Sequence, residues 1–221
     1  HEDIFDMESL QPFLEQTKYN IASHSPHAIS QGLLHNPEYD NPPIVIQLKG
    51  VNAEQETKTS NLAKTILNNK TVSQAIQNNK VLLGKKSAQS LRVLPGESVT
   101  LLYSEESDLS STRFKEVELI VGGIFETGID EYDYSLAYCS LDCFHSLFPD
   151  DDVSQIHLKL TDISKEGKTK ENLKKDLGVD IYSWKDLYPT LISAMKLESL
   201  GMLLILLLII IIATINVISV L

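Results

Sequence analysis

The stretch LGMLLILLLIIIIATINVISVL, residues 200–221, contains no charged side chain, and fourteen of its residues are Leu or Ile. Its polar side chains are those of Thr214, Asn216 and Ser219. A helix over this stretch would be roughly 33 Å long at about 1.5 Å per residue, which matches the hydrocarbon thickness of a bilayer. Residues 203–212 are all Leu or Ile and leave no polar face for water. We therefore predict a transmembrane helix rather than the core helix of a soluble domain.

Polar groups inside this span predict neighbouring helices. An unpartnered Asn216 would cost about 2 kcal/mol in hydrocarbon, so we expect Asn216 and Ser219 to contact other helices of a bundle. The chain is then expected to be a segment of a longer, multi-span membrane protein. A glycolipid-anchor tail, cleaved near Ser193 or Ala194, is the alternative interpretation of the same apolar run.

The charge of the chain excludes some classes of partner. All 19 basic and 30 acidic residues lie before residue 200, and the formal net charge is −11. Binding to nucleic acid needs clustered Lys and Arg, and so does electrostatic docking on an anionic membrane surface. Neither is expected here. About 200 residues suffice for one large domain or two small ones.

Hydrophobic spacing predicts an α+β fold. The expected strands or extended segments are 24–34, 43–50, 81–84, 98–103, 116–125 with its partner 135–141, 156–160 and 179–184. The expected helices are 4–20, 60–68, 85–91, 142–148 and 170–177, the last ended by Gly178. Residues 156–184 would form a β-α-β unit that pairs with residues 1–50. We therefore predict one domain from residues 1–50 and 151–190, an inserted β-rich subdomain at 51–150, and a helix at 191–221 that enters and crosses the membrane.

Catalytic motifs are incomplete in this sequence. Residues 84–87 read Gly-Lys-Lys-Ser, but a phosphate loop needs Ser or Thr directly after Gly-Lys and a glycine five residues upstream. Residues 96–98 start like a nucleophile elbow, but Thr100 occupies the place of its second glycine. The acidic patch of Asp130, Glu131 and Asp133 could do acid–base chemistry only within a cleft. We predict no catalytic residue, no cofactor-binding residue and no enzyme.

Histidine and cysteine spacings leave two questions open. His24, His27 and His35 could approach a metal ion, but solvated loop histidines are the simpler interpretation, so we predict no metal ligand. Cys139 and Cys143 lie four residues apart. They are two small buried residues at a strand end and a helix start, or a disulfide if the domain faces an oxidising compartment.

Several blocks of the sequence resemble the LolC/LolE family, the permease subunits of the ABC transporter that releases lipoproteins from the bacterial inner membrane. They are VLLGKKSAQSLRVLPGESVTL at 81–101, VGGIFETGIDEYDYSLAY at 121–138, KGV at 49–51 with Glu54, SWKDL at 183–187 with KLE at 196–198, and INVISVL at 215–221. The residues that match the family motifs are Gly84, Gly96, Gly123, Phe125, Gly128, Glu131, Asp133 and Trp184.

The resemblance implies a four-span permease whose periplasmic domain combines a porter-like part with an inserted β-rich part. It implies a separate ATPase subunit that binds ATP, a second permease subunit, a lipoprotein substrate and a periplasmic lipoprotein chaperone. In the subunit that recruits the chaperone, the loop before the 121–138 block carries proline. Residues 104–114 contain none, which puts chaperone capture by this chain in doubt.

Two other functional classes compete with transport. A permease-like module that moves no substrate could relay ATP hydrolysis to a periplasmic partner. Such a module would present a polar groove, whereas a lipid-handling domain needs apolar side chains facing the cavity between subunits. A single-span receptor or adhesin ectodomain is the third reading, and it would lack the further spans.

Overall fold

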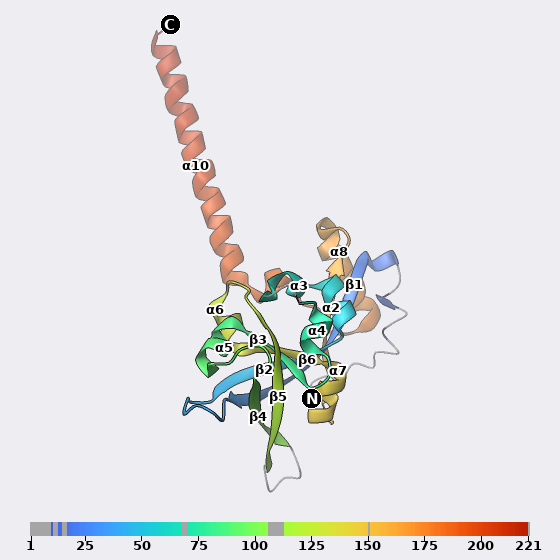
Figure 1. Ribbon diagram of the computed structural model, residues 1–221. Helices are drawn as coiled ribbons and strands as arrows, with labels where there is room; N and C mark the ends of the chain where they lie inside the picture. The colour runs from blue at the N-terminus through green and yellow to red at the C-terminus, as the bar shows by residue number, and fades with distance from the viewer. Residues whose placement is uncertain are drawn as a thin grey trace. The chain divides into compact units, whose positions relative to one another are not determined.

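Figure 1 shows the computed structural model, which describes residues 10, 13–14, 17–67, 70–105, 113–149 and 151–220. The strands are β1 (Ile21–His35), β2 (Ile44–Val51), β3 (Lys80–Gly84), β4 (Ser98–Glu105), β5 (Arg113–Phe125), β6 (Leu136–Ser140) and β7 (Val153–Leu160). The helices are η1 (Thr17–Tyr19), α2 (Ala53–Thr59), α3 (Leu62–Thr65), α4 (Val72–Ile76), α5 (Lys85–Leu91), α6 (Asp130–Ser135), α7 (Leu141–Leu147), η3 (Ile163–Lys165), α8 (Glu166–Leu177), α9 (Trp184–Leu187) and α10 (Pro189–Val220).

The chain divides into two units, residues 1–161 and residues 162–221. The first unit holds one mixed sheet in the order β2-β6-β3-β5-β4-β1-β7, and β2 also pairs with β1. All strands except β7 therefore form a closed ring, from which β7 extends along β1. Strand pairs β2–β6 and β3–β5 are parallel, and the others are antiparallel. The predicted α+β class is confirmed, and the insertion of residues 51–150 stays a prediction.

One long strand links the ring to β7. The first half of β1 pairs with β7 from Ile21 to Ala28, and its second half pairs with β2 from His27 to Leu34. The last residues of β1 also pair with β4. The predicted extended segment 24–34 is therefore the central part of a strand shared between three partners.

The main core contains residues from every strand of the ring. Ile44, Ile46 and Leu48 alternate inward along β2, while Val45 between them is exposed. β3 is buried at each position from Val81 to Gly84 because it lies between β5 and β6 and contacts α4 and α5. Helix α7 adds Phe144 to the same core cluster. Closing a sheet turns one face inward, and that face supplies this core.

A second, smaller core cluster lies under α3 and α4. It consists of Val51, Leu62, Ile66, Val72, Ala75, Ile76, Leu82 and Phe125. Helix α4 begins at a capping box, in which the Thr71 hydroxyl accepts from Gln74 N and the Gln74 side chain accepts from Thr71 N. Sequence analysis did not predict α2 or α6, whose residues are mostly polar, or α4, which has only five residues.

The second unit contains α8, α9 and α10. Gly178 ends α8 with φ +70°, as predicted. The predicted strand 179–184 is wrong, because residues 178–183 form no strand and Trp184 begins α9. Asp180 pairs with Lys174 of α8 at 3.0 Å. A capping box between Ser183 and Asp186 then starts the next helix, so this short segment joins two helices.

The pairing of β6 differs from the prediction. Segment 135–141 was expected to pair with 116–125, but β6 pairs with β2 and β3 instead. The reason is that β3, which is buried from Val81 to Gly84, occupies that edge of β5 by parallel pairing. The predicted helix 4–20 lies largely outside the described residues.

Candidate functional site

Asp133 organises the loop between β5 and α6. This residue is only 2% exposed. Its Oδ1 accepts hydrogen bonds from Thr127 N at 2.8 Å and from Thr127 Oγ1 at 2.7 Å, and its Oδ2 accepts from Gly128 N at 3.3 Å. Gly128 has φ +81°, a conformation that favours glycine. The carboxylate thus fixes the loop against the first turn of α6.

Gly84 allows α6 to approach the end of β3. A Cβ atom at Gly84 would lie 2.2 Å from Asp133 O and therefore could not be accommodated without a backbone shift. Beside it, Ser87 Oγ of α5 donates to Tyr134 O of α6 at 2.6 Å. Two family-motif positions far apart in sequence, Gly84 and Asp133, are thereby brought into direct contact.

The other motif residues of the first unit support this arrangement from the strands. Phe125 is fully buried in the second core cluster, where its ring meets Tyr138 edge-on at 5.5 Å between centroids. Gly123 pairs with Leu82 of β3. Gly96 has φ +106° in the turn before β4, and its N–H donates to Val121 O at 2.7 Å. These contacts hold β3, β4 and β5 in position.

The outer side of α5 and α6 forms a surface that we call the α5–α6 surface. It exposes Ile129 and Tyr134 at 52% and 45%, together with Glu131. Ion pairs frame it, Lys85–Glu126 at 2.7 Å and Lys86–Asp130 at 3.4 Å. Asp130 and Glu131 are solvent-exposed while the Asp133 carboxylate is bound by the loop. The three carboxylates of this acidic patch are therefore not gathered in one cleft.

Trp184, the remaining motif residue, lies in the second unit as the first residue of α9. It is 45% exposed, and Lys185 Nζ lies 5.8 Å from its ring centroid. Asp186 accepts from Lys170 Nζ at 2.7 Å, which ties α9 to α8. Trp184 is thus held at the turn that leads into α10.

Helix α10 has the length and composition of a membrane span. The candidate span is Pro189–Asn216; an 18-residue window of it has a mean hydropathy of 2.7, and none of that window is buried. The Leu and Ile side chains from 203 to 212 are each 45–61% exposed. An exposed apolar surface of this extent marks contact with lipid or protein. Asn216 is exposed in this helix, Thr214 Oγ1 donates to Ile210 O at 2.8 Å, and the Ser219 side chain lies outside the described residues.

A buried polar cluster joins α2 to β1. Glu56 is 2% exposed, and its Oε2 lies 2.7 Å from both Ser25 Oγ and His27 Nε2. Burial alone would raise the pKa of Glu56, but the hydrogen bond and charge of His27, with the hydroxyls of Ser60 and Ser25, lower it to about 2. Lys49 also faces this carboxylate, although burial lowers the pKa of its ammonium group.

The histidine expectation needs correction at this cluster. His27 is 1% exposed in a strand rather than solvated in a loop, and its ring lies 3.9 Å from that of His157. Its Nδ1 has no hydrogen-bond partner among the described residues. His24 instead faces Gln55 at 3.4 Å. In the part of the chain that the structure describes, no three His, Cys, Asp or Glu side chains are placed to hold a metal ion.

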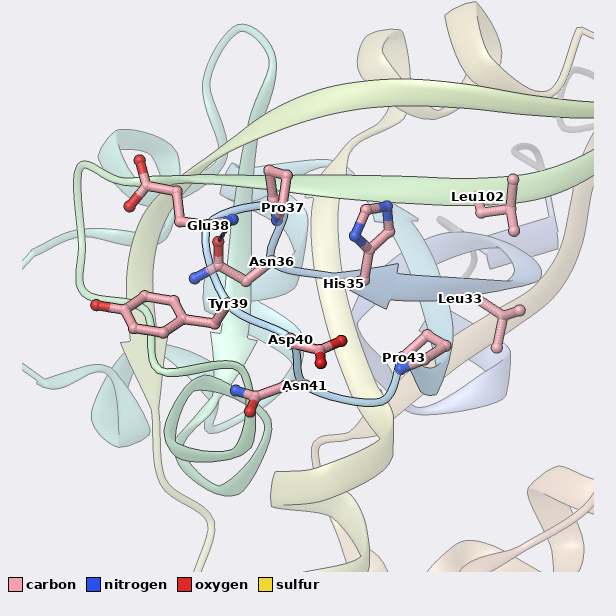
Figure 2. Close-up of a pocket in the computed structure, with 10 residues that line it drawn as sticks. All are labelled: Leu33, His35, Asn36, Pro37, Glu38, Tyr39, Asp40, Asn41, Pro43 and Leu102. Carbon is pink, nitrogen blue, oxygen red and sulfur yellow. Dashed lines mark hydrogen bonds between the residues drawn. The ribbon is translucent and has the colours of Figure 1, made fainter.

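A cavity of about 490 Å³ lies where the turn between β1 and β2 meets β4. Figure 2 shows the residues that line it. Leu33, Leu102 and Pro43 line one side of it, and His35, Glu38, Tyr39 and Asp40 are among its other lining residues. The turn is anchored on α5, because Asn36 Nδ2 donates to Leu91 O at 3.0 Å and Asn41 Nδ2 to Ser90 O at 3.1 Å.

Two curated proteins to which the chain is similar are both LolC proteins. The chain is 29% identical over 209 residues to the lipoprotein-releasing system transmembrane protein LolC of Xylella fastidiosa strain Temecula1, and 28% identical to LolC of strain 9a5c. Each alignment covers 93% of this chain and 50% of the relative. The chain thus spans about half the length of the curated relatives it matches. No family model matches the chain.

Solved structures confirm the fold. The extracellular domain of the noncanonic ABC-type transporter YknZ from Gram-positive bacteria aligns with a TM-score of 0.51 over 80% of this chain and 86% of its own, at 16% identity. The periplasmic region of MacB from Actinobacillus actinomycetemcomitans aligns with a TM-score of 0.50 over 80% and 76%, also at 16% identity. The chain therefore has the α+β fold of these ABC-transporter domains, and its predicted resemblance to LolC-type permease subunits is confirmed.

Proposed function

We propose that this chain is part of a permease subunit of a bacterial ABC transporter that extracts lipoproteins from the inner membrane. The observation that carries the proposal is similarity to LolC over 93% of the chain. The apolar helix α10, which is long enough to cross a membrane, is consistent with it. In this proposal the first unit stands in the periplasm and α10 crosses the membrane. The whole protein would be multi-pass, with α10 packed among further spans.

In such a transporter this chain would belong to the membrane-embedded permease and not to the subunit that hydrolyses ATP. ATP would be bound and hydrolysed by a separate ATPase subunit, while a second permease subunit completes the membrane channel as a homodimer or heterodimer. Lifting acyl chains into water costs about 0.8 kcal/mol per CH₂, so the paired permeases must offer the lipoprotein an apolar path. The loop held by Asp133 would contribute stiffness, because it joins β5 to α6, and α6 packs closely against Gly84 at the end of β3.

Chaperone capture by this chain is not part of the proposal. We expect this chain not to capture the chaperone because its loop 104–114 contains no proline. Residues 106–112 of that loop lie outside the described residues. The second permease subunit would then recruit the periplasmic lipoprotein chaperone, if the system uses one.

Reconstitution of the full-length protein tests the proposal. The protein is placed in proteoliposomes with its ATPase, its partner permease and a fluorescent triacylated lipoprotein, and release is followed with and without ATP. We expect ATP-dependent release that stops when the ATPase carries a substitution abolishing hydrolysis. Hydrolysis that activates a periplasmic partner without lipoprotein release would favour the relay module. A full-length protein with a single span would favour the receptor reading.

A further inference from the structure

The outer face of the ring carries a row of apolar side chains across three neighbouring strands. Leu33 of β1 lies opposite Val45 of β2 on one side and opposite Leu102 of β4 on the other. Residues that lie opposite each other in paired strands share one face of the sheet, with Cβ atoms about 5 Å apart. Val45 is 60% exposed, and Leu33 and Leu102 are half-buried. The adjacent residues Leu34 and Leu101 belong to the main core, on the opposite face.

The rows on either side of this apolar row are polar. One pairs Gln31 of β1 with Gln47 of β2, and the other pairs His35 of β1 with Thr100 of β4. Polar side chains are usual on a sheet face that meets water. Clustered apolar side chains on such a face mark contact with another molecule.

The apolar row borders the cavity shown in Figure 2. Leu33 and Leu102 lie at one end of the cavity with Pro43, and the Glu38 carboxylate lies at the other end. Its volume of about 490 Å³ is within the range of roughly 300–1,000 Å³ that ligand pockets have. The hydrogen bonds of two asparagine side chains hold the turn on α5, so the cavity is formed without a partner.

Negative charge surrounds the apolar row and the cavity. Four exposed carboxylates lie there, Glu38 and Asp40 on the turn and Glu116 and Glu118 on β5. Glu116 lies directly opposite Leu102. None of the four forms an ion pair with a described residue. Arg92, whose guanidinium lies 5.8 Å from the centroid of the Tyr39 ring, offsets only part of this charge.

We propose that this outer-row surface, made of Leu33, Val45, Leu102 and the cavity beside them, binds a segment of another protein in which basic side chains flank an apolar one. The apolar side chain would contact the row and the cavity, and Lys or Arg would face the carboxylates. The inference goes beyond the proposed function, because it holds whether or not the protein releases lipoproteins.

The charge of the surface decides between possible occupants. A second copy of the chain would bring the same carboxylates against each other, and like charges opposed across an interface are costly. Nucleic acid and anionic lipid would place phosphates against the carboxylates. A basic protein segment instead pairs each carboxylate with an opposite charge. Because the surface is small, the binding would be weak and transient.

Peptide titration tests the surface in the full-length protein. The protein is placed in phosphatidylcholine nanodiscs, with empty nanodiscs as the blank, and binding is followed by fluorescence anisotropy. The probe is a labelled peptide Lys-Arg-Leu-Arg-Lys, and its controls are Lys-Arg-Gly-Arg-Lys and Glu-Asp-Leu-Asp-Glu. We expect the leucine peptide to bind about tenfold more tightly than the glycine peptide, because its side chain leaves water. Equal affinity for these two peptides, or binding of the acidic peptide, would overturn the proposal.

Two charge reversals then locate the binding. Glu116→Lys should weaken binding of the leucine peptide about three- to tenfold, because it replaces an attraction by a repulsion. Glu54→Lys on α2 is the matched control, since Glu54 is exposed and the change in net charge is the same. We expect this control to change the affinity less than about twofold, because salt screens distant exposed charges. An equal loss in both variants would show attraction to the net charge of −11 alone and would overturn the proposal.

The apolar row is tested separately. Leu102→Ser should abolish the difference in affinity between the leucine and glycine peptides, with circular dichroism to verify folding. If that variant does not fold, Val45→Ser replaces it, because Val45 is the more exposed member of the row. A difference that persists in the folded variant would overturn the proposal. A wild-type dimer that dissociates on the same substitution, measured by analytical ultracentrifugation, would identify a second copy as the occupant and would also overturn it.

Discussion

Glu56 and Asp133 are both carboxylates at 2% exposure, yet the fold satisfies them in different ways. Asp133 accepts mainly from backbone N–H groups of its own loop, so it organises a local turn. Glu56 binds the side chains of Ser25 and His27, which lie about thirty residues earlier on β1. Asp133 is thus a local anchor, bound within its own loop, and Glu56 is a long-range anchor, bound to a distant strand, although both are equally buried. The burial of a carboxylate therefore does not show which segments of the chain it connects; its hydrogen-bond partners do.

The largest expected effect comes from removing the long-range anchor. A Glu56→Ala substitution leaves Ser25 and His27 buried without their acceptor, and breaking such a pair costs about 3–5 kcal/mol. Urea unfolding of the chain in detergent, followed by circular dichroism, measures the loss. Glu54→Ala on the same helix is the matched control, because Glu54 is exposed and its loss should cost less than about 1 kcal/mol. An equal loss in the free energy of unfolding for the two variants would contradict the role of Glu56 in holding α2 to β1.

Acid should weaken the same anchor. The pKa of Glu56 is about 2 in the folded chain against an ordinary 4.5. A lowered folded pKa gives stability that is present above pH 4.5 and is lost as the pH falls toward 2, on the order of 3 kcal/mol in total. Urea unfolding of wild type and Glu56→Gln at decreasing pH tests this. Their stabilities should converge below pH 4.5, and a constant difference would contradict the assignment.

The local anchor should cost less to weaken. Asp133→Asn keeps one acceptor oxygen but directs an amide toward the loop donors, and the loss of a charge-assisted hydrogen bond costs about 1.5–3 kcal/mol. Hydrogen exchange at Thr127 N and Gly128 N should rise in this variant. Asp130→Asn, at an exposed position on the same helix, should leave both the exchange and the stability unchanged. Unaltered exchange in Asp133→Asn would show that the loop is held by other contacts.

The smallest effect concerns the backbone next to Asp133. Gly84→Ala places a Cβ against Asp133 O, and such overpacking costs about 1–3 kcal/mol. Gly167→Ala in α8 meets no atom within 4 Å and should instead raise stability by up to about 1 kcal/mol. Thermal unfolding compares the two variants. A neutral Gly84→Ala would mean that α6 can move away from β3 freely.

The same contrast explains what could be predicted from sequence. Asp133 and Gly84 were found through motif blocks, and strands such as 43–50 through alternation of buried residues. Glu56 was missed, because α2 has no apolar period and its buried residue is charged. His27 lies in the predicted extended segment 24–34, but its burial was not predicted, because a histidine with polar neighbours gives no hydrophobic pattern. The strand 179–184 failed for the opposite reason: its alternation was real, but residues 179–183 only join α8 to α9, and the capping box of Ser183 and Asp186 begins a helix at Trp184.

The central claim is that α10 crosses a membrane while the first unit stands outside the cytoplasm. Fusing alkaline phosphatase, which is active only in the periplasm, after Thr161 and separately after the native residues that follow α10 tests it most directly. The account predicts high activity for the first fusion and background activity for the second. Equal activity at both points, or release of the protein from membranes by alkaline carbonate, would contradict it.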